Sequence, residues 1–320
     1  MRKIRVSAPG KVHLMGEYAV VYGKPALLAA INLRLSVTVE ELGKNNSTGE
    51  LITVVSAEST DHARYAVGFL LKELKIEGQT PIKVTIDSQI PAGYHLGSSA
   101  ALAVGLTGGV MYFFKNIWNP IRINELAYEI EKKQHGNPSG GDNTAVSMGG
   151  FIWFRKELEF LKSIWQLPFK PHDATNHFFL INTGRPKETT GQMVALVKEN
   201  VAKNPEKMQK LLDLNEQQVK RVTVALKEGN ENELIDAIRV GERTLEGMGV
   251  VSEKVKPLMR QIEGAGGAVK ILGGGGVSAG TGFLLCYHRD PANIESISEK
   301  YKFPLQTMTL GGEGVRLDEK

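Results

Sequence analysis

A nine-residue polar segment, residues 135–143, combines residue types that a phosphoryl-transfer site needs. It reads His-Gly-Asn-Pro-Ser-Gly-Gly-Asp-Asn, so one proline and three glycines shape the backbone around Asp142. Glu131 lies one helical turn earlier, in the last turn of an expected helix, where the dipole disfavours a carboxylate and a bound cation would offset that cost. The two acids therefore predict a metal ligand and a group that contacts a substrate hydroxyl.

Each acid also has a simpler interpretation. Asp142 is suited to cap a short helix over residues 143–146, whose N–H groups would keep the carboxylate ionised. Glu131 would then be a solvated surface charge, as most glutamates are. The simpler interpretation would be preferred for an isolated aspartate, so the neighbouring motifs decide.

A second segment, residues 91–101, has the composition of a phosphate-binding loop. It reads Pro-Ala-Gly-Tyr-His-Leu-Gly-Ser-Ser-Ala-Ala and runs into a helix-forming stretch. Small residues let the backbone approach an anion closely, and a helix N-terminus adds free N–H groups and a favourable dipole. Ser98 and Ser99 can offer hydroxyls to phosphate or Mg²⁺. This is not a Walker A loop, because no Gly-Lys-Ser/Thr follows. A serine that only caps the helix is the alternative.

Two further segments complete the set. In residues 7–23, Lys11 follows an expected Pro-Gly turn, where a lysine can pair with an acid and assist a reacting hydroxyl; Glu17 and Tyr18 are candidate substrate contacts for the same positional reason. In residues 264–282, nine of nineteen residues are glycine. Such a backbone can fold over phosphates, although a glycine-rich β-turn explains it equally well.

The elements that must position these segments follow from hydrophobic periodicity and turn residues. The pattern is of the α+β class, with two domains, 1–170 and 171–320, that meet near residues 160–175. In the first domain we expect short β segments within 3–40 and further strands at 51–55, 83–87 and 150–154. We expect helices there at 61–75, 98–114 and 121–134. In the second we expect helices at 188–202, 205–228, 231–247, 252–263 and 291–300, and strands at 178–182, 268–272, 281–287, 304–310 and 314–317.

Composition excludes several classes. The chain has 320 residues, 42% of them hydrophobic, and a net charge of +4 without an arginine-rich arm or basic stripe, so a nucleic-acid partner is not expected. No apolar run is long enough to span a membrane, and we expect no membrane association. The single cysteine, Cys286, predicts a reducing, cytoplasmic location and buried packing.

Taken in order, the segments resemble the motifs of the GHMP kinase superfamily. Pro9-Gly10-Lys11 with Gly16-Glu17 is similar to the first motif, residues 91–101 to the nucleotide-phosphate loop, and residues 273–276 to the third motif. Residues 135–140, followed by Asp142-Asn143, resemble the mevalonate kinases within that superfamily. Two further segments also resemble them, residues 182–187 and 311–316.

The resemblance implies a two-domain GHMP kinase fold. The N-terminal domain would be like domain 2 of ribosomal protein S5 and the C-terminal domain ferredoxin-like, with the active site between them. It implies ATP- and Mg²⁺-dependent phosphorylation of the 5-hydroxyl of mevalonate, in isoprenoid biosynthesis. Mevalonate and ATP would be the small-molecule partners, and a homodimer is compatible with the resemblance.

The resemblance also assigns residues by position. Asp142 matches the catalytic aspartate and Lys11 its partner, while Glu131 and Ser99 match the magnesium ligands. The ATP-binding loop would comprise Pro91, Gly93, Leu96, Gly97, Ser98, Ser99 and Ala100. Substrate contacts would come from Glu17, Tyr18, His135, Ser139, Gly140 and Asp142.

Three departures leave rivals open. His95 stands where the loop usually has glycine. Leu272 replaces a usual serine or threonine, and residues 273–276 lack the alanine common in the third motif. Tyr18 replaces a frequent histidine in a pattern familiar from phosphomevalonate kinases.

The closest rival is therefore a phosphomevalonate kinase or another GHMP small-molecule kinase, for which Arg185 and Lys187 could bind the extra phosphate. A non-catalytic ATP or metabolite sensor is a further alternative. The set of Lys11, Glu131 and Asp142 argues against it, since a pure binder does not need all three.

Overall fold

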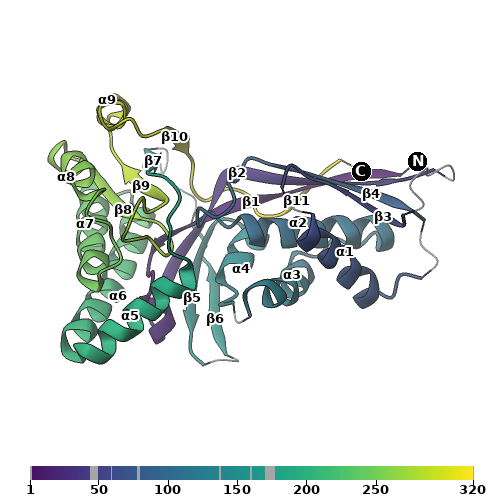
Figure 1. Ribbon diagram of the computed structural model, residues 1–320, viewed down its shortest axis with the longest axis horizontal. Helices are drawn as coiled ribbons and strands as arrows, with labels where there is room; N and C mark the ends of the chain where they lie inside the picture. Colours follow the sequence, from purple (N-terminus) through teal and green to yellow (C-terminus); the bar gives the residue numbers. More distant parts are fainter. Residues whose placement is uncertain are drawn as a thin grey trace.

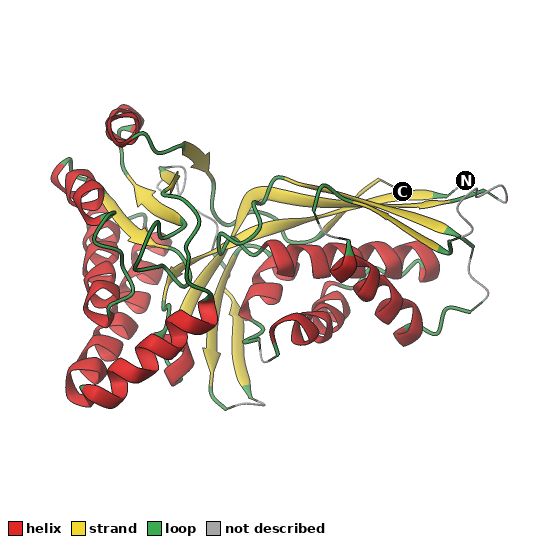
Figure 2. Cartoon of the chain, viewed as in Figure 1, coloured by secondary structure: helices red, strands yellow, loops and turns green. Residues whose placement is uncertain are grey.

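Two β-sheets, each backed by helices, build the protein (Figures 1 and 2). The computed structural model describes residues 2–43, 50–58, 60–77, 80–136, 138–158, 161–169 and 177–319, without the side chains of Gln134 and His135. The expected turn at 43–47 lies mostly outside this part, as does much of the expected domain boundary at 160–175.

The first sheet has seven strands, and its centre is the long strand β2. Its main order is β11-β1-β2-β4-β3, and β5 extends it from β2 to β6. Most pairs are antiparallel; β3 and β4 run parallel, with a helix between them. The strands are β1 (Lys3–Met15), β2 (Pro25–Glu41), β3 (Ile52–Val55), β4 (Ile82–Ser88), β5 (Phe151–Lys156), β6 (Lys162–Gln166) and β11 (Arg316–Glu319).

Strands β1 and β2 are both longer than the sequence predicted, and in β1 the reason is that the Pro-Gly pair does not form a turn. Pro9 and Gly10 lie inside β1, at a register shift where Pro9 faces Arg34 and Lys11 faces Ala30 of β2. Proline has no N–H to donate, so within a sheet it is tolerated at such irregularities. The shift places Lys11 next to the loop that precedes α2.

Four helices accompany this sheet, and the central one carries the predicted phosphate loop at its start. Helix α2 packs on β1 and β2, with α1 and α3 beside it (Figure 1). Asn119 caps α3 by accepting two backbone N–H groups, and Pro120 occupies the first turn as expected. The helices are α1 (Asp61–Glu73), α2 (Ser98–Lys115), α3 (Pro120–His135) and α4 (Gly141–Met148), with a short 3-10 helix η1 (Ala19–Tyr22).

The second sheet has the order β10-β7-β9-β8, antiparallel throughout. With one helical crossover after the first strand and one after the third, this is the β-α-β-β-α-β arrangement of a ferredoxin-like domain, as expected. Its strands are β7 (Phe178–Asn182), β8 (Ala268–Ile271), β9 (Phe283–Tyr287) and β10 (Leu305–Met308). Its helices are α5 (Thr190–Lys203), α6 (Pro205–Glu228), α7 (Glu231–Met248), α8 (Lys256–Gly264) and α9 (Pro291–Tyr301).

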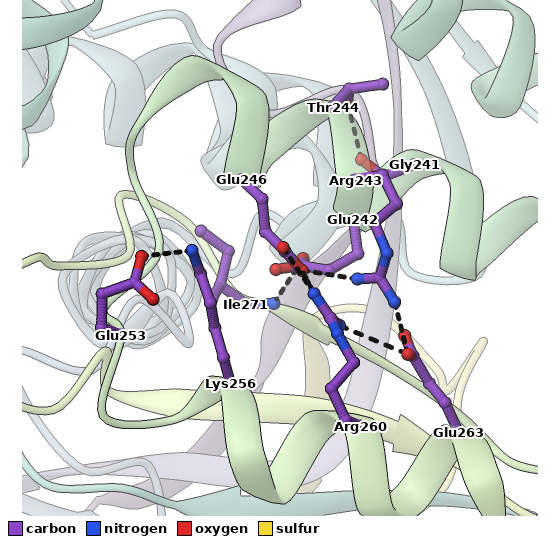
Figure 3. A network of polar contacts seen from close by, with 10 residues as sticks. All are labelled: Gly241, Glu242, Arg243, Thr244, Glu246, Glu253, Lys256, Arg260, Glu263 and Ile271. Carbon is purple, nitrogen blue, oxygen red and sulfur yellow. Dashed lines mark hydrogen bonds and ion pairs between the residues drawn. The ribbon is translucent and has the colours of Figure 1, made fainter.

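Ion pairs join α7 to α8 on this domain (Figure 3). Arg243 pairs with Glu246 and Glu263, and Arg260 pairs with the same two acids. On the inner side of α7, the Glu242 carboxylate accepts the backbone N–H of Ile271 in β8 at 3.0 Å. Helix α7 is thus held to the helix beside it and to the sheet beneath it.

The last strand crosses back to the first sheet. Arg5 of β1 faces Glu319 of β11, so the two ends of the chain lie side by side (Figure 1). A division into 1–170 and 171–320 therefore remains a proposal, in which residues 316–319 add a strand to the first sheet. Within the described residues, every helix is too short or too polar to cross a lipid bilayer. Cys286 is fully buried in β9, and burial raises the pKa of its thiol.

Candidate active site

The predicted acid and the predicted cation form an ion pair between β1 and α4. Lys11 Nζ lies 3.0 Å from Asp142 Oδ2. The lysine side chain is only 4% exposed, whereas that of Asp142 is 41% exposed, so the pair is anchored in the protein and its acid opens to solvent. A carboxylate in this position can meet a small-molecule hydroxyl.

Electrostatics keep Asp142 ionised. Burial by itself raises the pKa of this carboxyl, but the charge of Lys11 and a hydrogen bond from His13 outweigh it and hold the pKa well below its usual range. The expectation that Asp142 caps a helix is wrong. Gly140, which has no side chain, is the N-cap of α4, and Asp142 lies in the first turn.

The predicted phosphate loop lies directly against Lys11. The Lys11 backbone N–H donates to the carbonyl of Leu96 at 2.9 Å. A Cβ on Gly97 would lie 2.8 Å from Lys11 Cγ, and the φ of Gly97 is +79°, so glycine is required twice over. Gly97 is the N-cap of α2, and no side chain caps the helix. Its first N–H groups, with the hydroxyls of Ser98 and Ser99, therefore begin next to the Lys11–Asp142 pair.

Two members of the loop have buried side chains. Leu96 and Ala100 are 0% and 1% exposed, so neither presents its side chain to a ligand. Pro91, Ser98 and Ser99 are partly exposed and Gly93 is exposed. The loop thus offers backbone and hydroxyl groups, which suits anionic oxygens.

The proposed metal ligands meet across two helices. Ser99 Oγ, at the start of α2, hydrogen-bonds Glu131 Oε1, in the last turn of α3. Glu131 is only 5% exposed. A hydroxyl and a carboxylate are hard oxygen donors, and Mg²⁺ usually takes one or two protein oxygens and completes its shell with water and phosphate. The donor set fits Mg²⁺.

Two segments from the second half of the chain, around Arg185 and Gly273, pack against this loop. The Arg185 guanidinium lies where a Cβ on Gly93 would come within 2.8 Å of Nη2. His95 takes the left-handed backbone conformation, with φ 63°, and its side chain packs against Gly273 of the third motif. Burial, and then the charge of Lys11, lower the pKa of His95 to about 4, so the imidazole is neutral near pH 7. The positive φ of His95 means that the loop has the backbone conformation of a glycine at this position.

Known proteins share this chain's length and architecture. A family model described as "GHMP kinases N terminal domain" matches residues 61–150. A mevalonate kinase from Archaeoglobus fulgidus is 30% identical, over 84% of this chain and 88% of its own length. The chain belongs to the GHMP kinase family. A mevalonate kinase from Thermococcus sibiricus is 28% identical, over 99% of both chains. The crystal structure of the Methanococcus jannaschii mevalonate kinase superposes with a TM-score of 0.80 at 19% identity, over 97% of this chain and 99% of that one.

In this GHMP kinase, Glu17 and Tyr18 lie where the first half of the chain contacts the second half. The Glu17 carboxylate pairs with Lys270 of β8, and their side chains are 2% and 0% exposed. Tyr18 donates its hydroxyl to the carbonyl of Gly274 at 2.5 Å, and burial raises its pKa. These contacts join the two halves of the chain; that Glu17 and Tyr18 also contact substrate stays a prediction.

The loop before α4 is held from outside. Tyr128 of α3 donates to the carbonyl of Pro138 at 3.2 Å and accepts a hydrogen bond from Lys162 of β6 at 2.8 Å. Gly140, with φ +87°, packs against the same pair, and Ser139 Oγ accepts the N–H of Gly141. The GHMP kinase thus presents Ser139 and Gly140 beside Asp142; the side chain of His135, at the end of α3, lies outside the described part.

Sequence reasoning missed His13, which lies 3.3 Å from Asp142 between Nε2 and Oδ1. A signal was present, because residues two apart on a strand share a face and Lys11 had already been selected. Lys270 was missed as well. It stands in a strand of apolar residues, where a lysine is expected only if it is paired.

Proposed function

We propose that this GHMP kinase transfers the γ-phosphoryl group of ATP to the 5-hydroxyl of mevalonate and releases ADP and 5-phosphomevalonate. The observation that carries the proposal is the Lys11–Asp142 pair, packed against Gly97 at the uncapped start of α2. In this arrangement a group that would activate the hydroxyl lies beside a helix end that would bind phosphate. Relatives named as mevalonate kinases, one matched over 99% of both chains and one over 84% of this chain, support the choice of acceptor.

The chain's own residues supply positioning and charge. Backbone N–H groups at the start of α2 and the hydroxyl of Ser98 would hold phosphate oxygens. Asp142 would orient the acceptor hydroxyl and take its proton as the new O–P bond forms and the bond to the β-phosphate oxygen breaks. Lys11 would keep Asp142 ionised and in place. In a loose transition state such positioning and charge stabilisation supply most of the catalysis.

Ser99 and Glu131 would hold Mg²⁺ together with the nucleotide. When bound, the ion would neutralise charge on the phosphate oxygens. Ser139 and Gly140, beside Asp142, are proposed to contact the acceptor, and His135 keeps its predicted role there. A cytoplasmic location and a homodimer also remain proposals, the second testable by light scattering on the purified protein.

Phosphomevalonate is the alternative acceptor, and one observation favours it. Arg185 is exposed beside the loop at Gly93, and within the described residues its guanidinium has no hydrogen-bond or ion-pair partner. A cation so placed could bind the phosphate of an acceptor. It could equally bind the phosphates of ATP, which is consistent with mevalonate as acceptor.

A coupled ADP-release assay separates these acceptors. Mevalonate, phosphomevalonate, homoserine and galactose would be compared at equal concentrations with saturating ATP and Mg²⁺. We expect the highest kcat/KM with mevalonate. A preference for phosphomevalonate would move the assignment to that kinase, and ADP release from none of the four would reject the kinase proposal.

A further inference from the structure

Both oxygens of the Asp142 carboxylate are held, each by a different side chain of β1. Lys11 reaches Oδ2 at 3.0 Å, and His13 Nε2 lies 3.3 Å from Oδ1. The second contact is long for an N–H···O hydrogen bond, as catalytic hydrogen bonds often are before substrates bind. Residues 11 and 13 lie on the same face of the strand, so one rigid element fixes both contacts.

The surroundings of the imidazole indicate which nitrogen carries the proton. His13 Nδ1 is fully buried and has no hydrogen-bond partner among the described atoms. A proton on Nδ1 would be a buried, unsatisfied donor, which is costly. The neutral tautomer with its proton on Nε2 avoids that cost and donates to Asp142 Oδ1.

The backbone of His13 is fixed from the other half of the chain. Lys270 Nζ donates to the carbonyl of His13 at 3.1 Å, and the same ammonium pairs with Glu17 and donates to the carbonyl of Ile271. The His13 side chain is 16% exposed. The ring therefore has little freedom, unlike a lysine ammonium on a long flexible stem.

We propose that His13 is a positioning residue that fixes the plane of the Asp142 carboxylate toward the acceptor hydroxyl. The terminal torsion of an aspartate is broad, so a single contact from Lys11 would leave the carboxylate free to rotate about it. A second donor on the other oxygen removes that rotation. The inference rests on the proposed function.

Two substitutions distinguish the effect of the His13 N–H donor on activity from the effect of the volume of the ring. His13→Leu keeps an apolar volume and removes the N–H, whereas His13→Gln retains an N–H donor on a side chain of similar reach. In steady-state assays with mevalonate, we expect His13→Leu to lower kcat by about 10- to 100-fold, with the KM for ATP changed by less than about twofold. His13→Gln should recover most of that loss. His62→Leu in α1 is the matched control and should keep the wild-type kcat.

A double variant tests whether His13 acts through Asp142. In the Asp142→Asn background, His13→Leu should cause little further loss, because the group that it positions is already disabled. Wild-type kcat in His13→Leu would overturn the inference, as would equal losses in the Leu and Gln variants or full additivity with Asp142→Asn. Wild-type enzyme that releases ADP with none of the acceptors would instead overturn the proposed function, and the inference with it.

Discussion

Asp142 shows how far residue chemistry could be predicted from the sequence. The resemblance assigned Lys11 as its partner, and the ion pair between them confirms that pairing, while its role as the reactive acid stays a prediction. How it stays ionised was predicted incorrectly. The sequence favoured capping N–H groups, but the charge of Lys11 and the hydrogen bond from His13 do this instead. Lys11 and His13 are far from Asp142 in the chain, so the contacts depend on how α4 packs against β1, which local sequence does not encode.

Glu131 gives the first prediction at the residue scale. Glu131→Gln should raise the Mg²⁺ concentration needed for half-maximal rate by about tenfold or more, because a neutral amide is a weaker ligand for a hard cation. Initial rates against free Mg²⁺ at fixed ATP measure this. Glu129→Gln, two residues away on the exposed face of α3 where it pairs with Lys132, is the control. An unchanged Mg²⁺ requirement would leave Glu131 in a structural role, which includes its bond to Ser99.

At the scale of elements, helices were predicted well and strands less well. The starts of α2 and α3 carry local signals, a glycine before two serines and an asparagine before a proline. Strand β1 was split into short segments because Pro9 and Gly10 were interpreted as a turn, and β2 was also expected only as short segments. Strand β6 was not predicted; it is short and pairs only with β5 within the described residues, so tertiary context, not local pattern, defines it.

The loop before α2 gives a prediction at this scale. Gly97→Ala would place a Cβ against Lys11 and force alanine into the left-handed region, at a cost of about 1 to 3 kcal/mol. We expect a thermal midpoint lower by a few degrees and a raised KM for ATP. Gly68→Ala, in an exposed position of α1 with nothing within 4 Å of its Cβ, should keep or slightly raise the midpoint. Equal behaviour of the two variants would contradict a strained phosphate loop.

At the scale of the whole molecule, the two halves are joined by buried charges. Lys270 of β8 pairs with Glu17 of the first motif, while Glu242 of α7 lies close to both. Two buried acids face one lysine. Burial raises the pKa of Glu242 to about 8, although the charge of Lys270 opposes that shift. The overall α+β class and the ferredoxin-like second sheet were predicted. The cluster of Glu17, Lys270 and Glu242 could not be predicted, because its members come from distant segments.

The cluster of Glu17, Lys270 and Glu242 predicts that the stability of the protein depends on pH. The folded pKa of Glu242, about 8, lies above its usual value of 4.5, so the folded state retains a proton that the unfolded state has lost. This contribution to stability is complete below about pH 4 and disappears as the pH rises through 8. Relative to Glu242→Gln, the wild-type thermal midpoint should therefore fall between pH 5.5 and about 8.5.

The matched control for that series is Glu199→Gln. Glu199 lies exposed on α5 and pairs with Lys203. Its variant should follow the wild-type curve across the same range of pH. Parallel curves for the wild type and Glu242→Gln would show that Glu242 is ionised in the folded protein. That result would contradict the claim that folded Glu242 keeps its proton up to about pH 8.

Turnover of Asp142→Asn with mevalonate, measured together with the affinity for a non-hydrolysable ATP analogue, tests the central claim most directly. Asparagine keeps the size of the side chain and removes the negative charge that would orient the hydroxyl and accept its proton. We expect kcat to fall by about 10²- to 10⁴-fold while the Kd for the analogue changes by less than about threefold. A variant that binds the analogue normally and phosphorylates mevalonate at the wild-type rate would contradict the assignment of Asp142 and the site built around it.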